Sequence, residues 1–196
     1  MARPRQFDEK AVLTAVRDQF WTAGYAGTSL DDLLRVTGLG KGSLYAAFGD
    51  KRSLHRRVLG DYVEATHAAL RAMLTASPRA VDGLRRYLTA PTEDPTGAAA
   101  LRGCFLGNST SEMAAADTDM LAAAHRAFEE RTGILAEAVA RAQHEGDLPT
   151  GTDPAETARA VVTAQQGVVF MGRTGMDVTA LRAVAETLAD RILSRV

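Results

Sequence analysis

Five residues between positions 41 and 51 have the chemistry needed to bind an anion. Lys41 and Lys51 supply ammonium groups, Ser43 and Tyr45 supply hydroxyl donors, and Gly42 leaves the backbone open to close approach. Phosphate oxygens accept hydrogen bonds from all of these groups, and Lys51 lies at the expected start of a helix, where the dipole also favours an anion. The set is typical of a surface that binds nucleic acid.

Two short helices are expected to position these residues. The pattern Thr28-Ser29-Leu30-Asp31 has the form of a capping box and predicts a helix over 28–36, and a second helix is expected over 41–48. The turn between them contains two glycines, of which Gly38 fits a reversal with positive φ. Such a pair is the helix-turn-helix pattern, whose second helix enters the major groove of DNA. Many helical proteins contain two short helices and a glycine turn, so spacing alone leaves a structural role open.

The rest of the chain predicts further helices. Alanine, the best helix former, occurs 36 times, apolar residues recur at three- and four-residue spacing, and no segment alternates with a period of two. We therefore expect an all-α fold of about nine helices. They cover residues 8–24, 28–36, 41–48, 51–76, a segment beginning at 78, 98–115, 117–145, a segment beginning at 154, and 178–195.

Charge is divided unevenly along the chain. Residues 1–57 contain ten Lys and Arg against six Asp and Glu, and the remainder contains 13 against 18, so a head of +4 precedes a body of −5. A basic end suits a protein that presents one end to phosphates.

A single cysteine excludes an intramolecular disulfide and a Cys-rich zinc site. No signal sequence or apolar run of about 20 residues is visible, so we expect a cytoplasmic protein without membrane contact, metal or cofactor.

The run from residue 20 to residue 51 resembles the DNA-binding domain of the TetR family of bacterial repressors. The resemblance is carried by Gly24-Tyr25, Thr28-Ser29, Gly38, Lys41-Gly42-Ser43-Leu44-Tyr45, Phe48 and Lys51. It is close over residues 8–60, and beyond them it rests on length, helix count and the run Gly103-Cys104-Phe105-Leu106. It implies a helix-turn-helix domain over 1–50 with recognition helix 41–48, and a regulatory and dimerisation domain over 51–196. Helix 51–76 would connect the two.

The resemblance implies specific roles in the head. Thr28, Ser29 and Lys51 would contact phosphate, while Lys41, Gly42, Ser43 and Tyr45 would form the surface of helix 41–48 that faces the groove. This sequence departs from the family at Gly40, where many members have a capping serine, and at Ala46-Ala47, where bulkier residues are common. Few side chains are then left to read bases, so specificity would rest on Lys41, on DNA shape and on an arm containing Arg3 and Arg5.

For the body, the resemblance implies a homodimer that binds double-stranded DNA at a palindromic operator and is released by an unknown small-molecule inducer. Ordinary burial within one chain is the alternative for the dimer stripe, and plain core is the alternative for the pocket set. The predicted dimer contacts are Val161, Val168, Leu181, Val184, Leu188 and Ile192, and the predicted pocket residues are Cys104, Phe105, Met113, Phe128, Gln165 and Phe170.

The resulting hypothesis is a TetR-type transcriptional repressor that responds to a ligand. One alternative is a repressor that senses electrophiles or oxidants through Cys104, and another is a helical ligand-binding dimer that does not bind DNA. An enzyme is not expected, because the sequence lacks the common zinc-protease, Walker A, nucleophile-elbow and dinucleotide motifs, and its four histidines are scattered.

Overall fold

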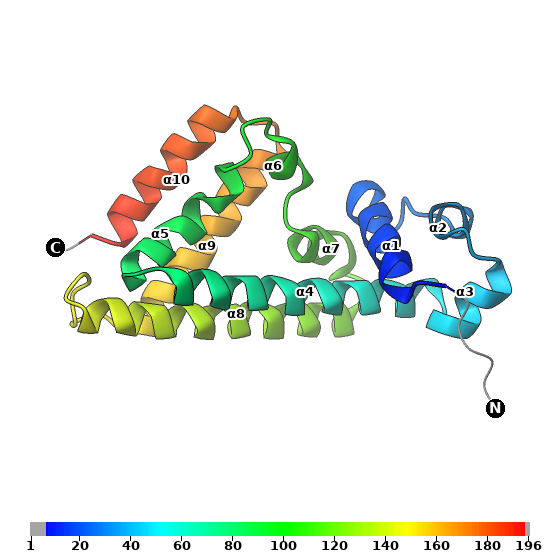
Figure 1. Ribbon diagram of the computed structural model, residues 1–196, viewed down its shortest axis with the longest axis horizontal. Coiled ribbons are helices and arrows are strands. Elements are labelled where there is room, and N and C mark those ends of the chain that lie inside the picture. Colours follow the sequence, from blue (N-terminus) through cyan, green and yellow to red (C-terminus); the bar gives the residue numbers. More distant parts are fainter. Residues whose placement is uncertain (1–6, 195–196) are drawn as a thin grey trace.

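A computed structural model describes residues 7–194. All the regular secondary structure in this part of the chain is helical, and it contains no strand (Figure 1). The all-α prediction is confirmed. None of the helices in the described range is long and apolar enough to cross a bilayer. Arg3 and Arg5, the predicted arm, lie outside the described residues. The elements are α1 (Glu9–Ala23), α2 (Leu30–Thr37), α3 (Lys41–Phe48), α4 (Lys51–Ala76), α5 (Ala80–Thr89), the 3-10 helix η1 (Ala90–Thr92), α6 (Ala98–Arg102), α7 (Phe105–Met113), α8 (Thr118–His144), α9 (Pro154–Arg173) and α10 (Val178–Ile192).

The main departure from the predicted elements is a break near residue 103. The sequence predicts one helix over 98–115, but α6 ends at Gly103, which has φ 67°, and α7 begins after Cys104. A Cβ at Gly103 would lie 3.1 Å from side-chain atoms of Arg173 and Asn108, so both the backbone angle and the packing favour glycine. The break turns α7 towards α1 (Figure 1).

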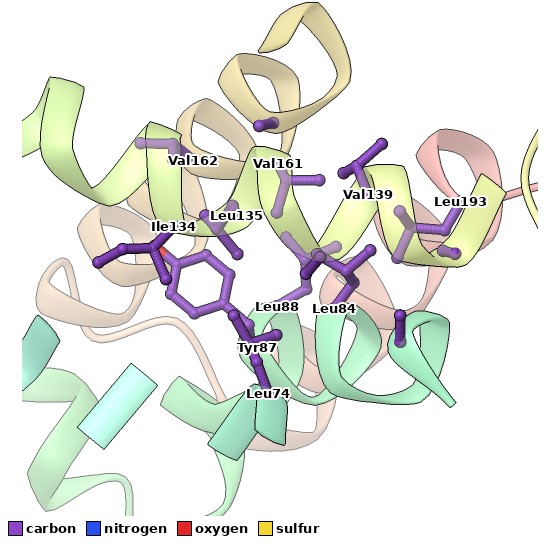
Figure 2. Close-up of a cluster of buried hydrophobic side chains, with 14 of the residues drawn as sticks. Leu74, Leu84, Tyr87, Leu88, Ile134, Leu135, Val139, Val161, Val162 and Leu193 are labelled. Carbon is purple, nitrogen blue, oxygen red and sulfur yellow. The ribbon is translucent and has the colours of Figure 1, made fainter. Parts of the chain in front are cut away.

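Two long helices form the axis of the molecule. α4 and α8 run side by side, with α1, α2 and α3 at one end and α5, α9 and α10 at the other (Figure 1). At the far end Leu84 and Leu88 of α5 pack with Leu135 of α8 and Val161 of α9 (Figure 2). We call this cluster the body core; burial of its apolar surface fixes α5, α8 and α9 together.

A second cluster, the junction core, joins the head to the body. It contains Phe20 of α1, Leu44 of α3, Leu54 of α4 and Phe105 of α7, all 1% exposed. The core under the helix-turn-helix therefore continues across residue 50, where the sequence places a domain boundary. α7 contributes to the same apolar interior as α1 and α3.

Candidate nucleic-acid interface

The helix-turn-helix begins with a side-chain cap on α2. Ser29 is the cap: its Oγ accepts a hydrogen bond from the Asp32 backbone N–H at 3.1 Å, and the Asp32 carboxylate accepts one from the Ser29 N–H at 3.0 Å. The sequence places this box one residue earlier, on Thr28 and Asp31. At the other end Gly38 has φ 67° and ends α2 in the left-handed conformation expected of it.

Thr28 does not face outward, which corrects one predicted phosphate contact. Its side chain is fully buried, and its hydroxyl donates to the Gly24 carbonyl at 2.7 Å. A threonine one position before the cap points back at the preceding turn, so it closes the loop between α1 and α2. Ser29 remains exposed at the start of α2.

The outer face of α3 is open to solvent. Lys41, Gly42, Ser43 and Tyr45 are exposed, whereas Leu44 on the opposite side is 1% exposed and anchors the helix in the junction core. We call these four exposed residues the α3 face. Within it the Lys41 ammonium lies 5.9 Å from the centre of the Tyr45 ring. The face therefore presents a cation, two hydroxyls and an uncovered stretch of backbone on one side of a short helix.

The free positive charge of the head is concentrated on lysines. Among the described residues, Lys41 and Lys51 form no ion pair, and the Lys51 ammonium lies 4.3 Å from the centre of the Tyr25 ring. Arg52 and Arg56, by contrast, bind the carboxylates of Asp117 and Asp119 at 2.7 and 2.6 Å. These two arginines hold α4 against the start of α8, so the charge available to an external anion is smaller than the sequence sum indicates.

Glu112 of α7 holds the loop between α1 and α2. Its carboxylate accepts hydrogen bonds from the backbone N–H groups of Tyr25 at 2.8 Å and Ala26 at 2.6 Å. Gly24 is required beside it, because its φ is 77° and a Cβ would lie 2.9 Å from the Glu112 carboxylate. The contact links residues more than 80 positions apart, and no motif in the sequence predicts it.

His55 lies where α1, α4 and α7 meet. It is 1% exposed, its Nε2 lies 3.2 Å from the Ser109 hydroxyl oxygen, and its ring packs edge-on against Phe20 at 5.0 Å. Burial lowers the pKa of His55 to about 4, and the charge of Glu112 only partly opposes this effect. The ring is therefore neutral at physiological pH, as part of the junction core.

The body contains two neighbouring cavities that share Trp21 and Cys104. The first, of about 620 Å³, lies between α1, α7 and the end of α9, and the second, of about 320 Å³, lies among α4, α5, α8 and α9. Of the predicted pocket residues, Cys104 borders both, Gln165 borders the second, and Phe105 and Phe170 border the first. Met113 and Phe128 border neither. Met113 is buried in the junction core, and the Phe128 ring lies 5.3 Å from the Arg131 guanidinium carbon.

Most of the predicted dimer stripe is covered within one chain. Val161, Val168 and Leu181 are at most 1% exposed, and Figure 2 shows Val161 among the side chains of the body core. Leu188 and Ile192 are partly buried against the same chain. The burial of Val161, Val168 and Leu181 corrects the prediction for these three positions, which form the inward stripe of α9 and α10, whereas Leu188 and Ile192 stay predictions. Val184 alone of the six is exposed, at 42%.

Two side chains that the sequence analysis missed border the second cavity with a polar group. Arg131 is buried at 5% exposure, and Tyr62 packs edge-on against Trp21 at 5.1 Å. Arg131 stands three residues after Phe128 and four before Leu135, which are apolar positions of α8. A charged residue within an apolar helical stripe is the signal that could have revealed it.

A helix-turn-helix with an open second helix, joined by one long helix to a hollow helical body, defines the class of ligand-responsive DNA-binding regulators. Residues 12–58 match the family described as bacterial regulatory proteins, tetR family, and residues 80–188 match a tetracyclin repressor-like C-terminal domain. The chain belongs to the TetR family, and it is a transcriptional regulator.

Individual relatives match over nearly the whole chain. The transcriptional repressor ComR of Escherichia coli K12 is 31% identical over 94% of this chain and 89% of that protein. A cysteine mutant of the TetR-family regulator CifR, solved with 26-bp double-strand operator DNA, is 29% identical with a TM-score of 0.77, covering 95% and 98% of the two chains. A TetR-family regulator from Cytophaga hutchinsonii has the same fold, with a TM-score of 0.86 at 22% identity, covering 98% and 96%.

Proposed function

We propose that this protein is a repressor that binds double-stranded operator DNA as a homodimer in the cytoplasm and leaves it when a small molecule enters the body. It acts by binding and not by catalysis. The α3 face enters the major groove, while Ser29 and Lys51 contact the phosphates on either side. The observation that carries this proposal is the exposure of Lys41, Gly42, Ser43 and Tyr45 together on a helix anchored by buried Leu44.

The route from ligand to DNA runs through the junction core. Trp21 of α1 borders both cavities, and its indole N–H donates to the Arg102 carbonyl of α6 at 2.9 Å. A ligand that binds two arrangements of α1 unequally shifts the population of head positions. In a dimer this changes the spacing of the two α3 faces, which must match the spacing of major grooves along the DNA.

A second copy would cover the outer faces of α9 and α10. Phe170, Met171 and Val184 are large apolar side chains that are 65%, 37% and 42% exposed. Small residues surround them on the same faces, and small residues let two helices approach closely. The exposed small residues are Ala160, Thr163, Gly167, Ala180, Ala183 and Thr187.

We infer that Cys104 lines a cavity and is not a redox switch. It is 8% exposed, its Sγ accepts from the Gly107 N–H at 3.4 Å, and the Tyr62 hydroxyl donates to it at 3.8 Å. A sensor thiol needs solvent access. Replacing Cys104 by serine should therefore leave the response to a non-reactive inducer intact.

The test uses DNA from upstream of the protein's own gene in a gel-shift titration. Tyr45→Ala and Lys51→Ala should each weaken binding about tenfold, since each removes a phosphate or groove contact without opening the core. Lys51→Ala should also lower the slope of log affinity against log salt by about one. Arg126→Ala, which removes an exposed cation of α8, is the matched control and should bind as the parent does.

Two results would contradict this function. Unchanged affinity in both head variants, with their melting temperatures preserved, would remove the α3 face as the DNA-binding surface. Failure of the parent protein to bind the upstream DNA would favour a helical ligand-binding dimer that does not bind DNA.

A further inference from the structure

The second cavity contains a buried charge without a counter-charge. Its lining is mostly apolar and aromatic, and Arg131 is the one charged residue among the described residues that border it. Arg131 is 5% exposed, and no described carboxylate lies within 4.0 Å of it. Arg79 of the body, by contrast, pairs with Asp147 at 2.7 Å.

A buried guanidinium without an acidic partner lowers the free energy of unfolding. It stays protonated in proteins, so it cannot lose its charge by giving up a proton. Removing such a cation from water without an anion carries a large free-energy penalty. The ring of Phe128, 5.3 Å away, and a hydrogen bond to the Tyr87 hydroxyl oxygen offer partial compensation, but neither supplies a negative charge. The protein therefore retains a group that is unfavourable for folding alone.

The neighbouring polar groups do not neutralise Arg131. Burial raises the pKa of Tyr87 to about 12 and also raises the pKa of Tyr62, so both phenols are neutral at physiological pH. The Arg131 charge adds to the burial that lowers the pKa of His67, which keeps that ring neutral as well. The Gln165 carbonyl oxygen is shared, accepting from Gln166 at 2.7 Å and from Tyr87 at 3.4 Å.

We propose that this cavity binds a small organic acid whose carboxylate pairs with Arg131 and whose apolar part lies against the aromatic wall. The inference rests on the proposed function, because it names the chemical class of the inducer. A guanidinium presents parallel N–H donors that match the two oxygens of a carboxylate. A single cation in an otherwise apolar lining balances one negative charge, whereas a phosphate dianion would leave a buried excess. The volume of about 320 Å³ suits a small ligand.

The position of the cavity connects acid binding to the head. Trp21 comes from α1, Tyr62 from α4 and Arg131 from α8, so a ligand there touches the head, the connecting helix and the body at once. Trp21 is the single tryptophan of the chain. Its fluorescence therefore reports occupancy of either cavity that it borders without a label, and variants of Arg131, which borders only the second, assign the signal.

The experiment compares acids with their uncharged amides at pH 7.5. Benzoate, phenylacetate and hexanoate are titrated against Trp21 fluorescence alongside benzamide, phenylacetamide and hexanamide. We expect saturable binding of at least one acid, at least tenfold tighter than its amide. Arg131→Met should abolish that preference and Arg131→Lys should keep part of it, while Arg126→Met, an exposed arginine on the same helix, should not alter it. The Met variant should fold with an unchanged or raised melting temperature, because it removes an unpaired charge.

Three results would overturn the inference: no acid of the set binds, an amide binds as tightly as its acid, or the Met variant keeps the preference. If the Met variant does not fold, Arg131 has a structural role, and the acid and amide titrations of the parent protein still decide. Operator binding is measured separately, by gel shift without ligand. Loss of that binding would contradict the repressor function, whereas loss of acid preference alone would contradict the ligand class.

Discussion

Gly42 lies on the α3 face without an internal reason to be glycine. Its backbone is helical, and a Cβ there would meet nothing within 4 Å among the described residues. In a helix, glycine is less favourable than alanine by roughly 0.5–1 kcal/mol. Glycine at this position leaves room for an external surface to come close to the backbone, as the proposed contact with DNA requires.

Replacing Gly42 by alanine should therefore separate stability from function. We expect the free energy of unfolding to rise by about 0.5–1 kcal/mol, and operator affinity to fall at least tenfold because the new methyl group holds the DNA away. Denaturant unfolding and gel shift measure the two quantities. Gly133→Ala in α8, which also has open space around it, is the control and should stabilise the protein without weakening operator binding. Equal operator affinity in both variants would remove Gly42 from the interface.

His55 makes the junction core sensitive to acid. Its pKa is about 4 in the folded protein and near 6.5 when unfolded, so the unfolded chain binds the extra proton first as pH falls. The stability contributed by neutral His55 is complete above pH 6.5 and is lost between pH 6.5 and 4, by up to about 3 kcal/mol. We expect His55→Gln to flatten the stability profile over this window, measured by urea unfolding. The exposed His125→Gln should leave the profile unchanged, and a parent profile that is flat there would contradict the assignment.

Among the helices, α7 makes two separate contacts with the head. Its Phe105 packs in the junction core, and its Glu112 carboxylate binds the backbone of the loop before α2. A displacement of α7 by a ligand in the adjoining cavity would therefore pull on the start of α2.

Glu112→Ala should loosen this connection. Two backbone N–H groups lose a charged acceptor, and we expect a cost of roughly 1–2 kcal/mol at this exposed site. Hydrogen exchange of the Tyr25 and Ala26 amides should accelerate, while the amides of the body core keep their protection. Glu129→Ala, an exposed carboxylate of α8, is the matched control. Unchanged exchange at Tyr25 would show that the loop is held by other contacts.

The elements differ in how far the sequence alone predicts them. The α3 helix, the Gly38 turn and the α4 boundaries follow from local signals, because caps, glycines and apolar spacing act within a few residues. The sequence pattern places the helix cap on Thr28, one position before the observed cap, Ser29. Both residue types are suitable caps, and packing against the rest of the chain determines which one is used. Glu112 and Arg131 depend on contacts between distant segments, and the inward stripe of α9 and α10 looks the same whether the chain or a partner covers it.

For the whole molecule, the decisive feature is that the head and the proposed partner surface lie on different helices. The α3 face is at one end of α4, whereas α9 and α10 belong to the body (Figure 1). A dimer through α9 and α10 holds two heads apart, and operator binding then depends on an interface that touches no DNA.

Val184→Arg tests this dependence. A buried, unpaired charge at the interface should convert the dimer to a monomer in sedimentation, and operator affinity should fall at least tenfold because one head binds without its partner. Leu121→Arg provides the control, since Leu121 is also apolar and 51% exposed but lies on α8. A Val184→Arg protein that sediments as a dimer would place the partner surface elsewhere.

The junction core sets a limit on how this protein can be divided and recombined. Phe105 and Leu106 of α7 pack in the same interior as Phe20 and Leu44 of the head. A cut after residue 50 would therefore expose Phe20 and Leu44 on one fragment and Phe105 and Leu106 on the other to water. A hybrid that grafts this head onto a foreign body needs a matching α7 surface in its new host. The head and the body of this chain share one core, so neither can be exchanged without rebuilding the surface of the other.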